Sequence, residues 1–351
     1  MAYELNSKLQ SLKPYQAVQG NYRIRLDANE SFRLPPPELV SRIEEAISAV
    51  PFNRYPDPYA AELCRAFADY YNVSPENVVA GNGSDELISI ICGTFLMKGE
   101  RMMTLSPDFS MYHFYSSINE AECVEFRKNE DFTVDIDKVI AAIREKHIRL
   151  VIFSNPCNPT SKGIVRADIR KLVKSVEALV VLDEAYMDFW DQSMLGEVDD
   201  FDNLIILRTC SKAFGMAAIR LGFAVSNQKL IRAIKAVKSP YNVNALTQTI
   251  GSIVFQQKNW VQASIHKIVA SKSALSEMLK YVEEQNPEKL QVYDGVTNFV
   301  LLKVSRGKEV YDSLLQKGIS VRFFREGNYL RVTAGTMEEN REFVSALKES
   351  L

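Results

Sequence analysis

Short apolar runs alternate with amphipathic helical segments through the middle of this chain, and this alternation constrains the fold more than any other feature. The runs have the length and composition of strands and cover residues 101–105, 122–126, 150–153, 179–182, 204–207 and 221–225. Between two of them, Val165, Ile169, Leu172, Val173 and Val176 recur at the spacing of one helix face. Apolar strands that alternate with such helices indicate a mostly parallel sheet covered on both faces. We therefore predict a large α/β domain over residues 46–240.

The pattern changes in the last third of the chain. A long helical stretch runs from Asn244 to about Glu284, and short strands are predicted near residues 298–302, 320–323 and 330–332. Thr336 and Glu339 then form a capping box at the start of a last helix. We predict that residues 241–351 form a smaller α+β domain together with the N-terminal arm, residues 1–45. A length of 351 residues suits two domains of roughly 150 residues or more each.

Composition excludes several classes of protein. Lys and Arg number 42 against 44 Asp and Glu without any basic cluster, so a nucleic-acid surface or a polybasic membrane anchor is not expected. The longest uncharged stretch in an apolar segment, Leu87–Met97, is about half of the ~20 residues that a membrane helix needs. The five cysteines form no C-x-x-C pair, and the first residues lack a secretory pattern. We therefore expect a cytoplasmic protein without a metal site.

Polar side chains follow three of the predicted strands. Asn158 comes after the third run, Asp183 and Tyr186 after the fourth, and Lys212 and Arg220 after the fifth. The carboxyl ends of parallel strands meet at one edge of a sheet, which is where ligands bind in such folds. The sequence therefore predicts an amide, a carboxylate, a phenol, a lysine and an arginine around one site.

A glycine-rich turn is predicted to bring an anion site to the same edge. The segment Gly81-Asn82-Gly83-Ser84-Asp85-Glu86 precedes a helical pattern, and its glycines allow an anion to approach the N–H groups at the helix start. Glu86 stands where a dinucleotide-binding motif requires its third glycine, which disfavours a nicotinamide-dependent dehydrogenase. No G-x-x-x-x-G-K-[ST] motif occurs, which excludes a P-loop.

Pyridoxal phosphate is the cofactor whose chemistry needs these groups together. A lysine forms a Schiff base with its aldehyde, a buried acid pairs with its pyridine nitrogen, and a helix start with cationic groups binds its phosphate. A binding or regulatory protein that has lost the chemistry is an alternative, but the retained Lys212 argues against it.

An ordered set of short motifs resembles a known enzyme family. The motifs are Arg54-Tyr55-Pro56-Asp57, Gly81-Asn82-Gly83-Ser84-Asp85-Glu86, Ser106-Pro107-Asp108-Phe109-Ser110-Met111-Tyr112, Asn158-Pro159-Thr160, Asp183-Glu184-Ala185-Tyr186, Ser211-Lys212-Ala213-Phe214, Arg220 and Leu330-Arg331-Val332-Thr333. In this order the chain resembles fold-type I pyridoxal-phosphate-dependent aminotransferases from about Pro14 to its C-terminus, and within them the histidinol-phosphate aminotransferase branch. The resemblance implies an α/β large domain with a mostly parallel sheet between helices, and a smaller α+β domain.

The resemblance also implies roles for residues that contact the cofactor. Lys212 is the Schiff-base lysine and the proton carrier, and Asp183 pairs with the pyridine nitrogen. Asn158 and Tyr186 bind the ring 3-oxygen, and Phe109 stacks on the ring. The phosphate is surrounded by Gly83, Ser84, Asp85, Ser211 and Arg220, and by Tyr55 of a neighbouring subunit, so the resemblance implies a homodimer with shared sites.

The substrate site is implied in the same way. Arg331 holds a substrate carboxylate or phosphate, and Tyr15, Asn29 and Arg322 lie nearby. The activity implied is transfer of the amino group of histidinol phosphate to 2-oxoglutarate, in histidine biosynthesis. An aromatic amino-acid aminotransferase and a threonine-phosphate decarboxylase use the same cofactor residues and stay open as alternatives.

Two positions depart from the family pattern. The family usually reads Asn-Pro-Thr-Gly, but here Ser161-Lys162-Gly163 follows Asn158-Pro159-Thr160, which displaces the glycine by two positions. Ala218 stands before Arg220 where relatives often have glycine. Both changes concern backbone geometry and leave the chemical groups in place.

Overall fold

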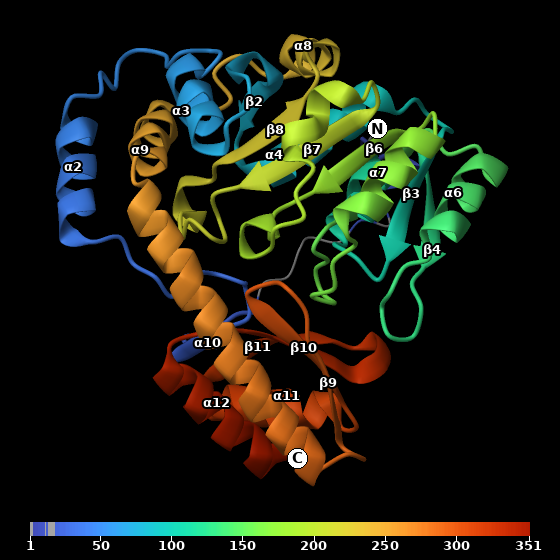
Figure 1. The fold of residues 1–351 in the computed structure, drawn as a ribbon, viewed down its shortest axis with the longest axis vertical. Helices are drawn as coiled ribbons and strands as arrows, with labels where there is room; N and C mark the ends of the chain where they lie inside the picture. The colour runs from blue at the N-terminus through green and yellow to red at the C-terminus, as the bar shows by residue number, and fades with distance from the viewer. Residues whose placement is uncertain (1–2, 11, 13–17) are drawn as a thin grey trace.

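The computed structural model describes residues 3–10, 12 and 18–351, and contains two sheets (Figure 1). The larger sheet has seven strands in the order β2-β8-β7-β6-β5-β3-β4. These strands are β2 (Val78–Gly81), β3 (Arg101–Ser106), β4 (Glu122–Arg127), β5 (Leu150–Ser154), β6 (Leu179–Asp183), β7 (Leu204–Thr209) and β8 (Gly222–Ser226). Strands β7, β6, β5, β3 and β4 are parallel, and β8 runs antiparallel to both of its neighbours. The predicted mostly parallel α/β sheet is confirmed.

Helices cover both faces of this sheet because its strands are apolar on both sides. Val180 and Leu182 of β6 belong to one core, whereas Val181 between them belongs to the core on the opposite face. The first core is covered by α3 (Ala61–Tyr71), α6 (Ile136–Glu145) and α7 (Arg166–Ser175). The second is covered by α4 (Gly83–Phe95), α5 (Met111–Ile118) and α8 (Gln228–Val237).

The smaller sheet has the strand order β1-β11-β12-β10-β9 and packs against the helices near the C-terminus (Figure 1). Its strands are β1 (Ile24–Leu26), β9 (Leu290–Tyr293), β10 (Phe299–Val304), β11 (Ile319–Phe324) and β12 (Tyr329–Thr333), and its helices are α11 (Gly307–Gln316) and α12 (Met337–Ser350). The predicted capping box of α12 is confirmed. The Thr336 hydroxyl accepts the backbone N–H of Glu339, and the Glu339 carboxylate accepts the backbone N–H of Thr336. Strands β1 and β9 were not predicted from the sequence.

The long helical stretch after residue 244 consists of two helices instead of one. Helix α9 (Ala245–Phe255) packs against α2 (Pro37–Ser48) and α3, and α10 (Lys258–Gln285) then runs across to the smaller sheet (Figure 1). Val261 near the start of α10 lies in the core of the large sheet, and Leu275 lies in the core of the small one. The predicted division into a large domain, residues 46–240, and a small domain from the rest of the chain stays a prediction. Because Val261 and Leu275 belong to different cores, the structure favours a domain boundary inside α10.

Short elements complete the described chain. They are the helix α1 (Ser7–Gln10) and the 3-10 turns Pro75–Asn77, Met187–Phe189, Leu195–Asp200, Ala217–Ile219 and Glu326–Asn328. Within the described residues, no helix combines the length and the apolar character needed to span a membrane.

Ser161, at a position where the sequence pattern led us to expect glycine, links loops of the two sheets. It has a φ of 62°, a conformation that glycine adopts more easily than other residues. Its hydroxyl shares a 2.6 Å hydrogen bond with that of Thr297, and its carbonyl accepts from the N–H of Val296. The loop that carries Asn158 is thereby fastened to the loop before β10.

Candidate active site

A cavity of about 380 Å³ lies at the carboxyl ends of β5, β6 and β7, where their last residues Ser154, Asp183 and Thr209 contribute to its wall. Most of the predicted site residues line it: Asn29, Ser84, Asp85, Phe109, Asn158, Asp183, Tyr186, Ser211, Lys212, Arg220, Arg322 and Arg331. The large sheet, the small sheet and the segment after β1 all contribute walls.

Lys212 extends from the turn after β7 toward the N-terminal arm. Its ammonium donates a 2.9 Å hydrogen bond to the carbonyl oxygen of Ala28. Burial, and next the positive charge of Arg331, lower the pKa of Lys212 to about 8. A substantial fraction of this lysine is therefore a neutral nucleophile slightly above neutral pH.

Asp183 ends β6 and is 5% exposed. One of its oxygens accepts the N–H of Ala185 at 3.1 Å, and the other accepts the hydroxyl of Tyr112 at 2.8 Å. Burial raises the pKa of Asp183 to about 6, and these two hydrogen bonds limit the rise. The residue is therefore an ionised carboxylate at neutral pH in a desolvated place, as an ion pair with a protonated ring nitrogen requires.

The start of α4 and Arg220 form a cradle suited to phosphate. Ser84 and Asp85 lie in the first turn of α4, where N–H groups and the helix dipole favour an anion. Arg220 donates to the hydroxyl of Ser211 at 3.3 Å. A Cβ on Gly83 would lie 2.9 Å from Nη2 of Arg220, so glycine permits this close approach. Ser84, Asp85, Ser211 and Arg220 line the cavity together, whereas Gly83 does not, and their binding of phosphate stays a prediction.

Two arginines from neighbouring strands face the same cavity. Arg322 of β11 and Arg331 of β12 are directly paired in the register of the small sheet. The guanidinium of Arg331 is held by Oδ1 of Asn158 at 2.5 Å and by the carbonyl oxygen of Asp27 at 2.6 Å. Arg331 is 7% exposed and lines the cavity, so its positive charge lies in a place with little competing water.

Asn29, in the segment after β1, forms a hydrogen bond with the Tyr186 hydroxyl. Its side-chain nitrogen donates to the hydroxyl of Tyr186 at 2.8 Å, and its backbone adopts a φ of 55°. The carbonyl oxygen of Asn29 accepts from Asn298, and its side-chain oxygen accepts from Thr333. Because Asn29 is held on both sides, it fixes the position of the Tyr186 hydroxyl.

Of the predicted site residues that the structure describes, Gly83 and Tyr55 do not line this cavity. Tyr55 is 81% exposed and stacks on Tyr241, with ring centroids 4.5 Å apart. Tyr15 lies outside the described residues.

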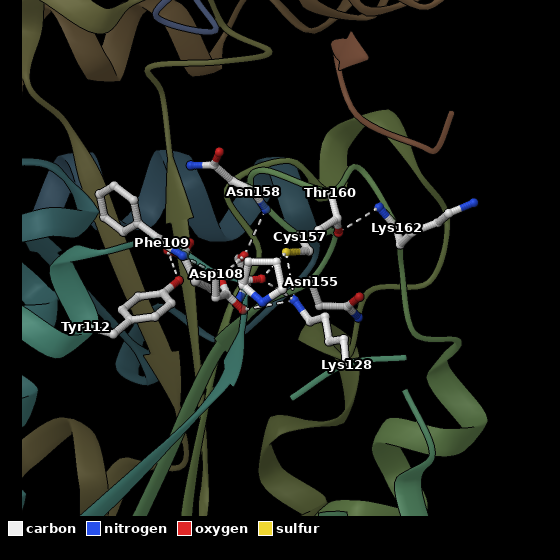
Figure 2. Close-up of polar contacts among 12 residues, drawn as sticks. Asp108, Phe109, Tyr112, Lys128, Asn155, Cys157, Asn158, Thr160 and Lys162 are labelled. Carbon is white, nitrogen blue, oxygen red and sulfur yellow. Dashed lines mark hydrogen bonds and ion pairs between the residues drawn. The ribbon is translucent and has the colours of Figure 1, made fainter. Parts of the chain in front are cut away.

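Sequence reasoning missed a buried cluster of Asp108, Lys128 and Cys157 (Figure 2), which adjoins the cavity because Asp108 contacts Ser154 of the cavity wall. Lys128 donates to the carbonyl oxygen of Pro107 at 2.8 Å and to the sulfur of Cys157 at 2.9 Å, and lies 3.6 Å from Asp108. Asp108 in turn accepts the backbone N–H of Phe109 at 2.8 Å. The cluster joins the segments before Phe109 and Asn158 through contacts that are distant in sequence, so periodicity carries no signal for it. Glu30 and Arg25, which also line the cavity, were likewise not assigned.

Comparison with known proteins agrees with this geometry. The model of the family "Aminotransferase class I and II" matches residues 23–347. The chain belongs to this family. The histidinol-phosphate aminotransferase of Clostridium novyi (strain NT) is 41% identical over 352 residues, which cover 99% of this chain and 98% of the relative. That of Clostridium kluyveri is 39% identical over 346 residues, which cover 98% and 97%.

A solved structure shows the same fold. The crystal structure of histidinol-phosphate aminotransferase from Sinorhizobium meliloti in complex with pyridoxal-5'-phosphate has a TM-score of 0.89 and 22% identity, and covers 100% of this chain and 98% of that one. The chain is thus a pyridoxal-phosphate-dependent aminotransferase of fold type I. The donor set fits the cofactor: Ser84, Ser211 and Arg220 suit its phosphate, and Asp183 suits its ring nitrogen.

The pKa of Lys212 predicts how this aminotransferase takes up its cofactor. Only the neutral amine attacks an aldehyde, so capture by cofactor-free protein is expected to rise about tenfold per pH unit below pH 8 and to level off above it. Stopped-flow absorbance between about pH 6 and pH 9 measures this rate. In Arg331→Met the midpoint should move to higher pH, because the neighbouring positive charge is gone. A capture rate independent of pH contradicts the assignment of Lys212.

Proposed function

We propose that this aminotransferase moves the amino group of histidinol phosphate to 2-oxoglutarate, forming imidazole-acetol phosphate and glutamate in histidine biosynthesis. The observation that carries the proposal is the pair Arg322 and Arg331 facing the cavity that holds Lys212. Guanidinium groups present paired donors that match phosphate and carboxylate. The names of the two clostridial relatives support the same substrate.

The chain's own residues then have separate tasks. When bound, pyridoxal phosphate supplies an aldehyde that condenses with amino groups and a ring that withdraws electrons from the substrate's Cα. Lys212 holds the cofactor and afterwards carries the proton to and from the substrate, which its lowered pKa favours. Asp183 provides a fixed negative charge, Tyr186 and Asn158 provide polar groups for the ring oxygen, and Phe109 provides an apolar face for the ring.

Arg331 has to serve both half-reactions if the proposal holds. Histidinol phosphate carries no carboxylate and glutamate carries two, so one anion position must accept different groups. We expect Arg331→Ala to raise the KM for both substrates, by about tenfold or more, since a hydrogen bond to a charged group contributes ~1.5–3 kcal/mol. Arg322→Ala should raise the KM for histidinol phosphate more than that for glutamate. Steady-state kinetics with each substrate varied separately measure both; an Arg331→Ala effect on one substrate alone contradicts a shared anion position.

We propose further that the enzyme is a cytoplasmic homodimer with shared sites. Tyr55 lies outside the cavity of its own chain, stacks on Tyr241 (40% exposed) and shares a surface hollow with Phe52 (73% exposed), so exposed apolar side chains there suit a second copy. Isologous contact of this surface is the simplest way to bring Tyr55 to another chain's phosphate cradle. All five cysteines are free, which suits a reducing compartment.

Mixing two inactive variants tests the shared site. A Tyr55→Ala chain and a Lys212→Ala chain that exchange subunits form mixed dimers with one intact site, so about a quarter of all sites should recover. Activity and bound cofactor are measured after mixing, with mass spectrometry of intact dimers as the control for exchange. Absence of recovery although mixed dimers form contradicts the contribution of Tyr55 across the interface.

A further inference from the structure

Tyr112 is a fully buried phenol that contacts two residues of the cavity wall, Asp183 and Phe109. None of the roles proposed for the site residues involves it. It lies in the first turn of α5, and its ring meets that of Phe109 edge-on, with centroids 5.6 Å apart. Figure 2 shows the two aromatic side chains side by side. The Tyr112 hydroxyl donates to Oδ2 of Asp183 at 2.8 Å. The helix start that presents Phe109 to the cavity thus also reaches the buried acid.

The charge on Asp183 is opposed by its surroundings. Burial favours the neutral carboxylic acid, and the like charges of Asp108 and Asp85 act in the same direction. The Tyr112 hydroxyl and the Ala185 N–H favour the charged form. The titratable and charged groups that face this carboxylate are Tyr112 from α5, Asp108 before α5, Asp85 from α4, Tyr186 after β6 and Lys212 after β7.

The Asp108 carboxyl near this bond is itself buried. Burial raises the pKa of Asp108, and Lys128, 3.6 Å away, and the Ser154 side chain limit that rise. Burial and the neighbouring Asp183 keep the pKa of Tyr112 well above its ordinary value, so its hydroxyl remains a donor. Tyr112 is therefore a permanent donor to a carboxylate that would otherwise tend to take up a proton.

We propose that Tyr112 is a positioning residue, which keeps the Asp183 carboxylate ionised and fixed in orientation so that it pairs with the ring nitrogen of the cofactor. The inference rests on the proposed role of Asp183. Tyr112 itself contacts the acid and does not line the cavity. Its effect should accordingly depend on the ring nitrogen and not on the phosphate or the aldehyde.

An analogue without the ring nitrogen tests this inference. Full-length chain freed of cofactor is titrated with pyridoxal phosphate and with its 1-deaza analogue, in which C–H replaces the ring nitrogen, and binding is followed by absorbance and fluorescence. Tyr112→Phe removes one hydroxyl and retains the ring. We expect it to weaken binding of pyridoxal phosphate about tenfold and to leave binding of the analogue unchanged. The affinity for pyridoxal phosphate should fall at acidic pH, and in Tyr112→Phe this fall should begin at a higher pH. The reason is that Asp183 loses the hydrogen-bond donor that favours its charged form.

Tyr71→Phe is the matched control. The hydroxyl of Tyr71 also donates to a carboxylate, Asp188, at 2.8 Å, but neither residue lines the cavity. This variant should retain the wild-type preference for pyridoxal phosphate over the analogue. Equal weakening of both ligands by Tyr112→Phe, or no weakening of either, overturns the inference.

The same titration separates this inference from the proposed function. Wild-type protein that binds both ligands equally well contradicts the role of Asp183 and with it the site proposed here. A wild-type preference for pyridoxal phosphate that survives Tyr112→Phe contradicts the role of Tyr112 alone.

Discussion

Lys212→Ala is expected to abolish both the covalent attachment of the cofactor and transamination. The variant loses the amine that bonds the aldehyde and the group that carries the proton, and general acid–base catalysis alone contributes about a hundred- to ten-thousandfold in rate. We expect turnover to fall at least a thousandfold, roughly the middle of that range or more. The cavity should still bind pyridoxal phosphate non-covalently through Ser84, Ser211 and Arg220.

Borohydride reduction and mass spectrometry locate the bond. In the unchanged protein the reduced adduct should be found on Lys212, and the visible absorbance band should disappear on reduction. Lys229→Ala, a change on the exposed surface of α8, is the control that leaves both unchanged. Recovery of the adduct on another lysine contradicts the assignment.

Asp183→Asn is expected to damage turnover far more than folding. A neutral amide cannot stabilise a protonated ring nitrogen, and one such interaction in a desolvated site contributes a few kcal/mol, or about two to three orders of magnitude in rate. The free energy of unfolding should change little in comparison, because the amide oxygen of asparagine can still accept the Ala185 N–H and its NH2 group can donate to the Tyr112 hydroxyl, which then acts as the acceptor.

Steady-state kinetics and urea unfolding measured on the same preparation separate the two effects. Asp200→Asn, at an exposed position away from the cavity, controls for a general effect of losing one carboxylate. If Asp183→Asn retains more than about half of the wild-type kcat, the proposed pairing of Asp183 with the ring nitrogen is contradicted, since the expected loss is far larger.

The sequence predicted the large sheet well because its strands are apolar on both faces. Leu179–Asp183 and Leu204–Thr209 are recognisable as buried strands without any knowledge of the fold, and the polar residues that end them point to the site. Strands β1 and β9 have three and four residues with partly exposed positions, so they show too little alternation to be recognised. The break between α9 and α10 falls at Gln256 and Gln257, where neither glycine nor proline marks it.

The parts of the site that were missed depend on long-range contacts. Lys212 bonds to Ala28, 184 residues earlier, and Tyr112 bonds to Asp183, 71 residues later. Such pairs follow from the packing of whole elements and leave no periodic signal in the sequence. The chemical groups could be predicted from the ends of strands, whereas the contacts that set their charge and orientation required the structure.

The central claim is tested most directly by the products of the purified, cofactor-loaded enzyme. Histidinol phosphate and 2-oxoglutarate should yield glutamate, and phenylalanine, tyrosine and threonine phosphate should be poorer substrates under the same conditions. Threonine phosphate should release no carbon dioxide. Carbon dioxide release from threonine phosphate, faster turnover of an aromatic amino acid, or no glutamate from histidinol phosphate would contradict the proposed function.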